Sequence, residues 1–192
     1  MKNIVLIILI PFLYVNLTNC SNPKKDKEKQ IIESFYKAYN TKDYNKLSKI
    51  IGDNIELYEM GQLVLKSKER YMDIVEWGEV FSSKNILDSI YLSDEIWTCK
   101  ETQESERISF LYNRAINSIA KYYIAEGKVV KIEIDLPNFD SDLDTQKSKE
   151  FQKWVYENHP ELMAKLNMLS KEGAEKYKQA MEMYRKKQSK TP

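Results

Sequence analysis

The chain has 192 residues, of which 42% are hydrophobic and 31% are charged. Its 30 basic and 29 acidic residues nearly cancel, so the composition supplies no overall field that would steer the protein to nucleic acid. Five glycines and five prolines are too few for a disordered or loop-rich chain, and the length suits one domain with an appendage.

Residues 1–19 have the pattern of an export signal. Lys2 gives a positive start, and residues 4–15 form an apolar run that only Pro11 interrupts. This run is too short to cross a bilayer as a helix, because a transmembrane helix needs about 20 apolar residues. A short apolar segment behind a lysine is typical of a secretory signal peptide.

The signal ends in Leu17-Thr18-Asn19-Cys20, which resembles the bacterial lipobox. The resemblance implies cleavage before Cys20 and a diacylglycerol on its thiol, although Asn19 stands where a small Gly, Ala or Ser is usual. We therefore expect a lipoprotein of the bacterial cell envelope, anchored to a membrane through Cys20. A plain secretory signal with an incidental cysteine and a retained membrane anchor are the alternatives. Residues 20–29 are mostly charged and polar, which predicts a solvated tether.

Apolar spacing predicts three helices and a hairpin in the first half of the mature chain. Residues 28–39 repeat apolar side chains every three or four positions, and Ser67 suits the N-cap of a later helix. Gly61 separates two stretches that alternate like strands. The expected elements are helices at 28–39, 44–51 and 67–81 and strands at 55–58 and 62–65.

Beyond residue 84 the apolar period changes to two, which predicts strands. The expected elements are strands at 86–92 and 96–102, a turn at 101–106, a long β-rich segment at 107–125 with a bulge near 113–115, and a last strand at 128–136. Helices followed by a meander of long antiparallel strands give an α+β fold, in which the helices cover the apolar face of the sheet.

Three motifs in this order resemble the SnoaL-like branch of the nuclear-transport-factor-2-like (NTF2-like) superfamily. They are residues 35–40 with Asp43 and Leu47, Asp53-Asn54-Ile55-Glu56, and the hairpin at residues 125–130. The likeness spans residues 28–137, and it implies a SnoaL-like domain at 30–137. In that family a curved sheet and helices form a cone whose mouth is an apolar pocket. Members include isomerases, cyclases, dehydratases and binding or scaffold modules, so the fold alone says little about activity.

The resemblance implies that an enzyme of this kind would hold a His or Asp base inside the cone. The only histidine, His159, lies outside the cone segment, and we expect it on the solvent side of a helix break. Asp88 is a weak candidate for the base, because strict alternation puts it on one strand face with Ile86 and Ile90. The simpler interpretation places Asp88 at a frayed strand start or at a helix end. Asp135 points away from the apolar face of its strand.

Aromatic residues with polar tips are the candidate ligand-binding groups, because such side chains grip amphipathic molecules. Ordinary core packing is the alternative, and it is the commoner role. Cys99 has no cysteine partner, so we expect an inert, buried thiol. The candidates for ligand contact are Tyr39, Tyr58, Trp77, Trp97 and Tyr112.

The sequence predicts neither a metal site nor a cofactor. It has no cluster of ligating residues at a regular spacing and no phosphate-cradling glycine loop. Asp140, Asp142 and Asp144 resemble the start of a calcium loop, but the glycine and the terminal glutamate of such a loop are missing. A linker is the expected role.

Residues 138–192 are expected to form a helical extension, with a helix at 147–157 and another that begins at Pro160. The second helix has a heptad-like apolar seam and a surplus of lysine. The extension could fold back on the domain or project with a solvated basic face. A homodimer, a partner helix or anionic lipid is the alternative use. The seam consists of Leu162, Leu166, Leu169, Gly173, Tyr177, Ala180 and Tyr184.

We therefore expect a membrane-anchored module whose cone binds a small apolar ligand or a protein partner without catalysis. One alternative is an enzyme of the isomerase or cyclase type with Asp88 as its base. The other is an envelope scaffold that acts through the basic C-terminal helix.

Overall fold

The computed structural model describes residues 22–139, 141–166 and 168–189. The predicted export signal, Cys20 and Asp140 lie outside these residues. The elements are α1 (Pro23–Thr41), α2 (Tyr44–Ile50), β1 (Ile51–Glu59), β2 (Gln62–Lys66), α3 (Lys68–Val80), β3 (Lys84–Ser93), β4 (Ile96–Glu104), α4 (Glu106–Tyr112), β5 (Ile116–Ala125), β6 (Lys128–Asp135), α5 (Ser141–Asn158), α6 (Pro160–Leu166) and α7 (Lys171–Gln188).

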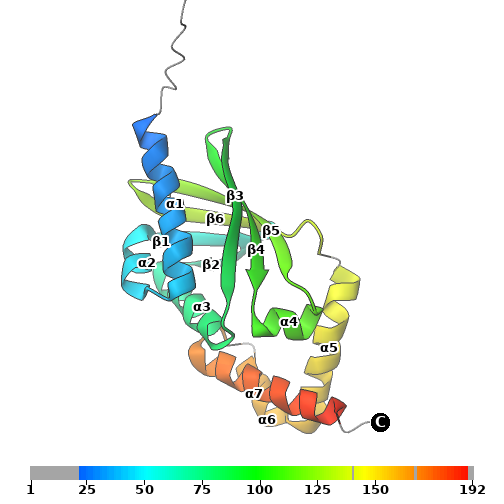
Figure 1. Cartoon of the computed structure of the whole chain (residues 1–192). Coiled ribbons are helices and arrows are strands. Elements are labelled where there is room, and N and C mark those ends of the chain that lie inside the picture. Colours follow the sequence, from blue (N-terminus) through cyan, green and yellow to red (C-terminus); the bar gives the residue numbers. More distant parts are fainter. Residues whose placement is uncertain (1–21, 140, 167, 190–192) are drawn as a thin grey trace, which may run out of the picture.

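The six strands form one sheet in the order β2-β1-β6-β5-β4-β3. Neighbouring strands are antiparallel except β1 and β6, which run parallel. The sheet twists strongly, so that β3 and β4 stand at a steep angle to β1 and β6 (Figure 1). The predicted α+β fold is confirmed.

The first hydrophobic core lies between the sheet and the helices α1, α2 and α3. Helix α1 buries one stripe of side chains at helical spacing, as its sequence predicts. Phe35 is at the centre of this core, with its ring centroid 5.4 Å from that of Tyr122 and 6.0 Å from that of Tyr71. The inner face of β5 alternates as expected for a half-buried strand, since Ser118, Ala120 and Tyr122 are all buried.

The second hydrophobic core joins α5, α6 and α7 to the end of the domain. Phe151 of α5 is fully buried there, 5.2 Å from Phe110 of α4 and 5.2 Å from Tyr177 of α7 between ring centroids. The extension therefore folds back on the domain, below α3 and α4 in Figure 1. Most of the predicted apolar seam packs within the chain, because Leu162, Leu166 and the buried face of α7 belong to this core.

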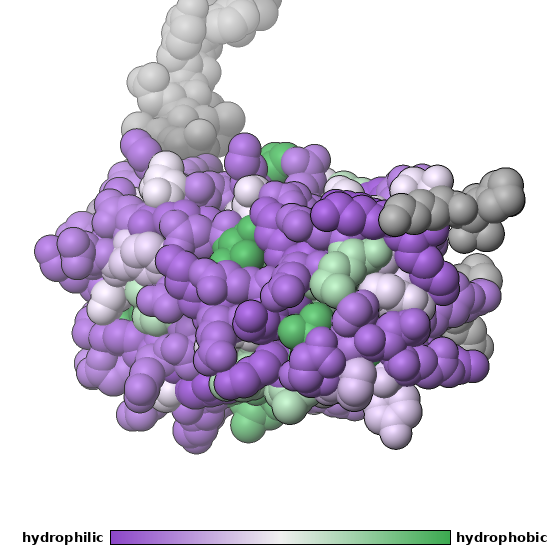
Figure 2. Space-filling model, turned by 90° about the horizontal axis from the view of Figure 1, so that it is seen from below, coloured by the Kyte–Doolittle hydropathy of each residue, from purple (hydrophilic) through white to green (hydrophobic). Residues whose placement is uncertain are grey.

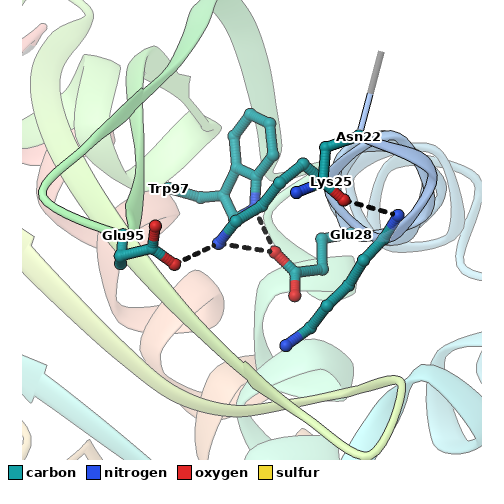
Figure 3. Close-up of polar contacts among 6 residues, drawn as sticks. Asn22, Lys25, Glu28, Glu95 and Trp97 are labelled. Carbon is teal, nitrogen blue, oxygen red and sulfur yellow. Dashed lines mark hydrogen bonds and ion pairs between the residues drawn. The ribbon is translucent and has the colours of Figure 1, made fainter. Parts of the chain in front are cut away.

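Helix α1 begins earlier than the sequence predicts, so the expected tether at 20–29 is wrong from Pro23 onward. Asn22 caps the helix by accepting a hydrogen bond from the backbone N–H of Lys24 at 3.1 Å, and Pro23 occupies the first turn. Figure 3 shows how the first turns are fixed to the β3–β4 hairpin. Lys25 Nζ lies 2.8 Å from Glu95, and Trp97 Nε1 donates to Glu28 at 3.0 Å. The composition of residues 20–29 does not predict these contacts, because their partners lie about 70 residues further along the chain.

The long β segment predicted at 107–125 is also wrong in its first part. Strand β4 continues to Glu104, through the predicted turn, and residues 106–112 form helix α4 before β5 begins. Ser105 caps α4 by accepting a hydrogen bond from the N–H of Ile108 at 3.0 Å, and Asn113 ends it in the left-handed conformation. Phe110 and Leu111 are buried in the second core. Tertiary packing therefore outweighs the strand preference of this apolar segment.

Replacing Gly173 with alanine is expected to destabilise the extension. A Cβ atom there would overlap the carbonyl oxygen of Met168 and lie 3.0 Å from that of Lys165, in the turn between α6 and α7. We expect Gly173→Ala to lower the free energy of unfolding by about 1–3 kcal/mol, measured by urea denaturation. Glu175→Ala changes an exposed residue of the same helix and should stay within about 0.5 kcal/mol of the wild type. Equal stability of the two variants would contradict the close approach.

Candidate functional site

A cavity of about 450 Å³ lies where the open end of the cone meets the C-terminal extension. The domain supplies most of its walls, from α1, α3, α4 and five strands. The extension supplies four lining residues, among them Leu166, Leu169 and Tyr177, so it completes the cavity. From below, the outer face of this end is largely hydrophilic with small separate apolar areas (Figure 2). The other lining residues are Tyr39, Leu57, Glu59, Val64, Tyr71, Ile74, Trp77, Gly78, Ser83, Asn85, Gln103, Glu104, Ser105, Arg107, Ile108, Ile134 and Gln152.

Two of the five aromatic candidates line this cavity, namely Tyr39 and Trp77. Tyr112 lines a neighbouring hollow, which shares Arg107 and Ile108 with the main cavity. The structure thus brings three of the five candidates to one end of the molecule.

The other two candidates have structural contacts elsewhere. Trp97 is buried in the first core, with its indole N–H bonded to Glu28. Tyr58 is half-buried, with its hydroxyl bonded to Glu56 at 3.2 Å and Lys131 Nζ 5.5 Å from its ring centroid. Neither residue lines the cavity.

Asp88 is exposed and does not line the cavity. The pairing of β3 with β4 shifts register between Leu87 and Ser89, which makes a bulge at Asp88. The bulge interrupts the alternation, so the expectation from strict alternation that Asp88 points into apolar company is wrong. Its carboxylate accepts a hydrogen bond from Thr102 Oγ1 at 2.9 Å. Asp88 lies within β3, and neither at a frayed end nor at a helix end.

Glu101 on β4 is the buried acid that sequence reasoning missed. Its exposed fraction is 1%, and it is the only buried charged residue in the described part of the chain. Tyr36 donates to one carboxylate oxygen at 2.7 Å, while Ser118 and Gln103 donate to the other at 2.8 and 3.0 Å. The signal was present in the sequence, because Glu101 continues the inward alternation of Trp97 and Cys99. The predicted turn at 101–106 hid it.

Four buried tyrosines and one thiol surround Glu101. Burial raises the pKa of Tyr36, Tyr71 and Tyr122 well above the usual value, and the nearby charge of Glu101 adds to the shift. The same two causes raise the pKa of Tyr39 to about 12. Burial also raises the pKa of Cys99 to about 12, so the thiol stays protonated at neutral pH, as expected for an inert cysteine.

Glu101 does not itself line the cavity. Gln103 does, and it uses its side-chain amide to bond Glu101 and Ser118 behind the wall. Tyr39 and Tyr71 also line the cavity and experience the charge of Glu101. The carboxylate of Glu101 therefore supports the cavity wall from behind. Both of its oxygens accept hydrogen bonds from protein side chains.

Arg107 of α4 lies beside two aromatic rings in the cavity wall. Its Cζ atom is 5.3 Å from the ring centroid of Trp77 and 5.3 Å from that of Tyr177. These cation–π contacts help to hold the side chain of Arg107, which is only partly exposed. Sequence analysis did not select Arg107, because it lay within the predicted strand at 107–125.

The remaining candidates have ordinary surroundings. His159 is half-buried between α5 and α6, so its expected place at a helix break is confirmed. Asp135 is exposed, as predicted. Within residues 22–139, 141–166 and 168–189, no group of His, Cys, Asp and Glu is suited to hold a metal ion. Over the same residues, every helix is too short or too polar to cross a membrane.

No protein-family model and no curated protein matches the sequence. Solved structures do match. The epoxide hydrolase/cyclase-like enzyme SalBIII, described in pyran ring formation in the polyether salinomycin, has a TM-score of 0.52 at 15% identity, covering 59% of this chain and 93% of that one. A putative ketosteroid isomerase from Kribbella flavida has a TM-score of 0.50 at 4% identity, covering 60% and 82%.

An NTF2-like protein of unknown function from Cytophaga hutchinsonii has a TM-score of 0.46 at 14% identity, covering 55% of this chain and 86% of its own. The chain shares the fold of the SalBIII and Kribbella flavida structures. The resemblance seen in the sequence is thus confirmed at the level of fold. At these identities the likeness carries no statement about activity.

The buried tyrosines predict a loss of stability at alkaline pH. Tyr39 has a usual pKa near 10.0 in the unfolded chain and about 12 in the folded protein, so unfolding releases a proton between these values. Stability should therefore fall as pH rises above about 10, by about 1–1.5 kcal/mol at pH 11 and about 2–3 kcal/mol in total above pH 12 for this one group. Tyr39→Phe should show a shallower fall, measured as the free energy of urea unfolding at pH 8, 10 and 11. Identical slopes for the two proteins would show that Tyr39 is not the source.

Proposed function

We propose that this chain is a membrane-anchored binding module whose cavity holds a small apolar ligand without changing it chemically. The observation that carries the proposal is the cavity of about 450 Å³, in which aromatic and aliphatic side chains from the cone are completed by the C-terminal extension. This volume lies in the range of small-molecule pockets, which are mostly apolar with a few placed polar groups.

The carboxylates near the cavity support binding in preference to proton transfer. A general base must lie within hydrogen-bond reach of its substrate and is usually held against an apolar wall. Glu101 accepts three hydrogen bonds and does not line the cavity, and Asp88 is exposed outside it. Glu59 and Glu104 do line the cavity, but both are exposed. None of the four combines access with an apolar setting.

The solved structures with TM-scores of 0.50 or more include an epoxide hydrolase/cyclase-like enzyme and a putative ketosteroid isomerase. An isomerase or cyclase activity based on Asp88 finds no support in the position of that residue. Asp88→Asn should therefore leave ligand binding and stability close to the wild type, measured by ligand titration and urea denaturation. A specific loss of turnover on any substrate that the protein converts would revive the enzyme hypothesis.

The anchor through Cys20 is the second half of the proposal, and it rests on the sequence pattern. We expect Cys20→Ser to move the protein from the membrane fraction to the soluble fraction of cells. We also expect the wild type, but not the variant, to carry the mass of a lipid in intact-protein mass spectrometry. An unmodified Cys20 in a membrane-free wild-type protein would refute the anchor without touching the cavity.

The cavity can be tested with N-phenyl-1-naphthylamine, a neutral apolar fluorophore, on residues 21–192, which contain both hydrophobic cores. We expect the dye to bind with a rise in fluorescence. Ile108→Trp fills the cavity and should weaken binding at least about tenfold, since the new side chain takes the volume of the ligand. Ser109→Trp is the matched control, because Ser109 is exposed on the same helix and outside this cavity. No binding, or equal effects of both variants, would overturn the proposal.

A further inference from the structure

Three buried polar atoms in the cavity wall have no hydrogen-bond partner. They are Trp77 Nε1, Arg107 Nε and Tyr177 Oη, and they are the only buried side-chain nitrogen or oxygen atoms without a partner in the part of the chain that the structure describes. All three residues line the same cavity. Buried polar groups are nearly always paired, so three exceptions in one wall call for a physical reason.

The three groups are close together and share one chemical character. The rings of Trp77 and Tyr177 have centroids 6.3 Å apart, and the guanidinium of Arg107 is 5.3 Å from each. An indole N–H and a guanidinium N–H can only donate, and a phenol hydroxyl can donate. Three neighbouring residues of the cavity lining therefore each hold a buried donor without an acceptor.

The cluster also carries a positive charge that the protein leaves unpaired. Among the described residues Arg107 forms no ion pair, whereas the adjacent acid, Glu106, is bound to Lys178 at 2.8 Å. The acids that share the cavity with Arg107 are Glu59 and Glu104, and both are exposed, where solvent screens their charge. A carboxylate has two oxygens that accept from several donors, and a planar guanidinium can bind both of them through two parallel hydrogen bonds.

The rest of the wall is mixed, with aliphatic side chains beside polar residues such as Asn85 and Gln103. The aliphatic part offers room for a hydrocarbon body. It includes Leu57, Ile74, Ile108, Ile134, Leu166 and Leu169. We infer that the cavity binds a monocarboxylic acid with an apolar body, its carboxylate at Arg107, Trp77 and Tyr177 and its hydrocarbon part along these aliphatic side chains. The inference rests on the proposed binding function and adds the chemical class of the ligand.

Displacement of N-phenyl-1-naphthylamine from residues 21–192 tests the inference with a matched pair of ligands. Decanoate and 1-decanol have the same carbon chain, and only decanoate carries the anionic head group at pH 8. We expect decanoate to displace the dye at a concentration at least about tenfold lower, because hydrogen bonds to charged groups are the stronger ones. Equal displacement by both ligands overturns the inference while dye binding still supports the proposed function. Failure of the dye itself to bind overturns both.

Two variants assign the preference to the donor cluster. Arg107→Met keeps an unbranched apolar stem and removes the charge. It should weaken decanoate binding about 10- to 100-fold, and weaken 1-decanol and the dye at least about tenfold less. If it weakens all three alike, the head-group assignment is wrong.

Tyr177→Phe removes only the unpartnered hydroxyl and keeps the ring that packs against Arg107. Because the hydroxyl has no partner in the free protein, the variant should be at least as stable to urea as the wild type. Its decanoate affinity should fall about three- to tenfold. A loss of stability together with unchanged decanoate binding would show that the hydroxyl serves the fold and not the ligand.

Discussion

A carboxylate sealed inside the cone is tolerated only while donors surround it, and Glu101 has three of them. Tyr36 comes from α1, Ser118 from β5 and Gln103 from β4, so one charged group ties a helix to two strands of the sheet. Tyr36 and Tyr39 are one helical turn apart on α1. The hydrogen bond from Tyr36 to Glu101 therefore also helps to position Tyr39 in the cavity wall. A change at Glu101 should for this reason also change the shape of the cavity.

The C-terminal extension packs against the domain through a second core that is rich in aromatic side chains. Phe151 meets rings from α4 and α7, and α7 in turn contacts α3. The same helix that closes the second core carries Tyr177 into the cavity. Helix α7 therefore contributes both to the packing of the extension and to the cavity wall. The neighbours in fold match only about three fifths of this chain, a share close in size to the segment from α1 to β6.

Sequence periodicity predicted the long helices, the β1–β2 hairpin and the strands β3 and β6, since each buries one face at a regular spacing. It failed where distant residues decide the local structure. Helix α4 has only seven residues, and its stability depends on burying Phe110 and Leu111 against the extension. The bulge at Asp88 arises from pairing with β4, and the first turns of α1 depend on Glu95 and Trp97. For the site, Tyr39 and Trp77 followed from composition, whereas Arg107 and Glu101 required the fold.

The early start of α1 limits the distance between Cys20 and the folded domain. Only Ser21 and Asn22 separate Cys20 from the helix, and two residues of extended chain span at most about 7 Å. With a rise of about 1.5 Å per residue, Tyr39 lies about 24 Å further along the same rigid rod. If Cys20 carries a lipid, the β3–β4 hairpin, which contacts the first turns of α1, would lie near the anchor point, and the cavity wall at Tyr39 would lie farther from it along α1.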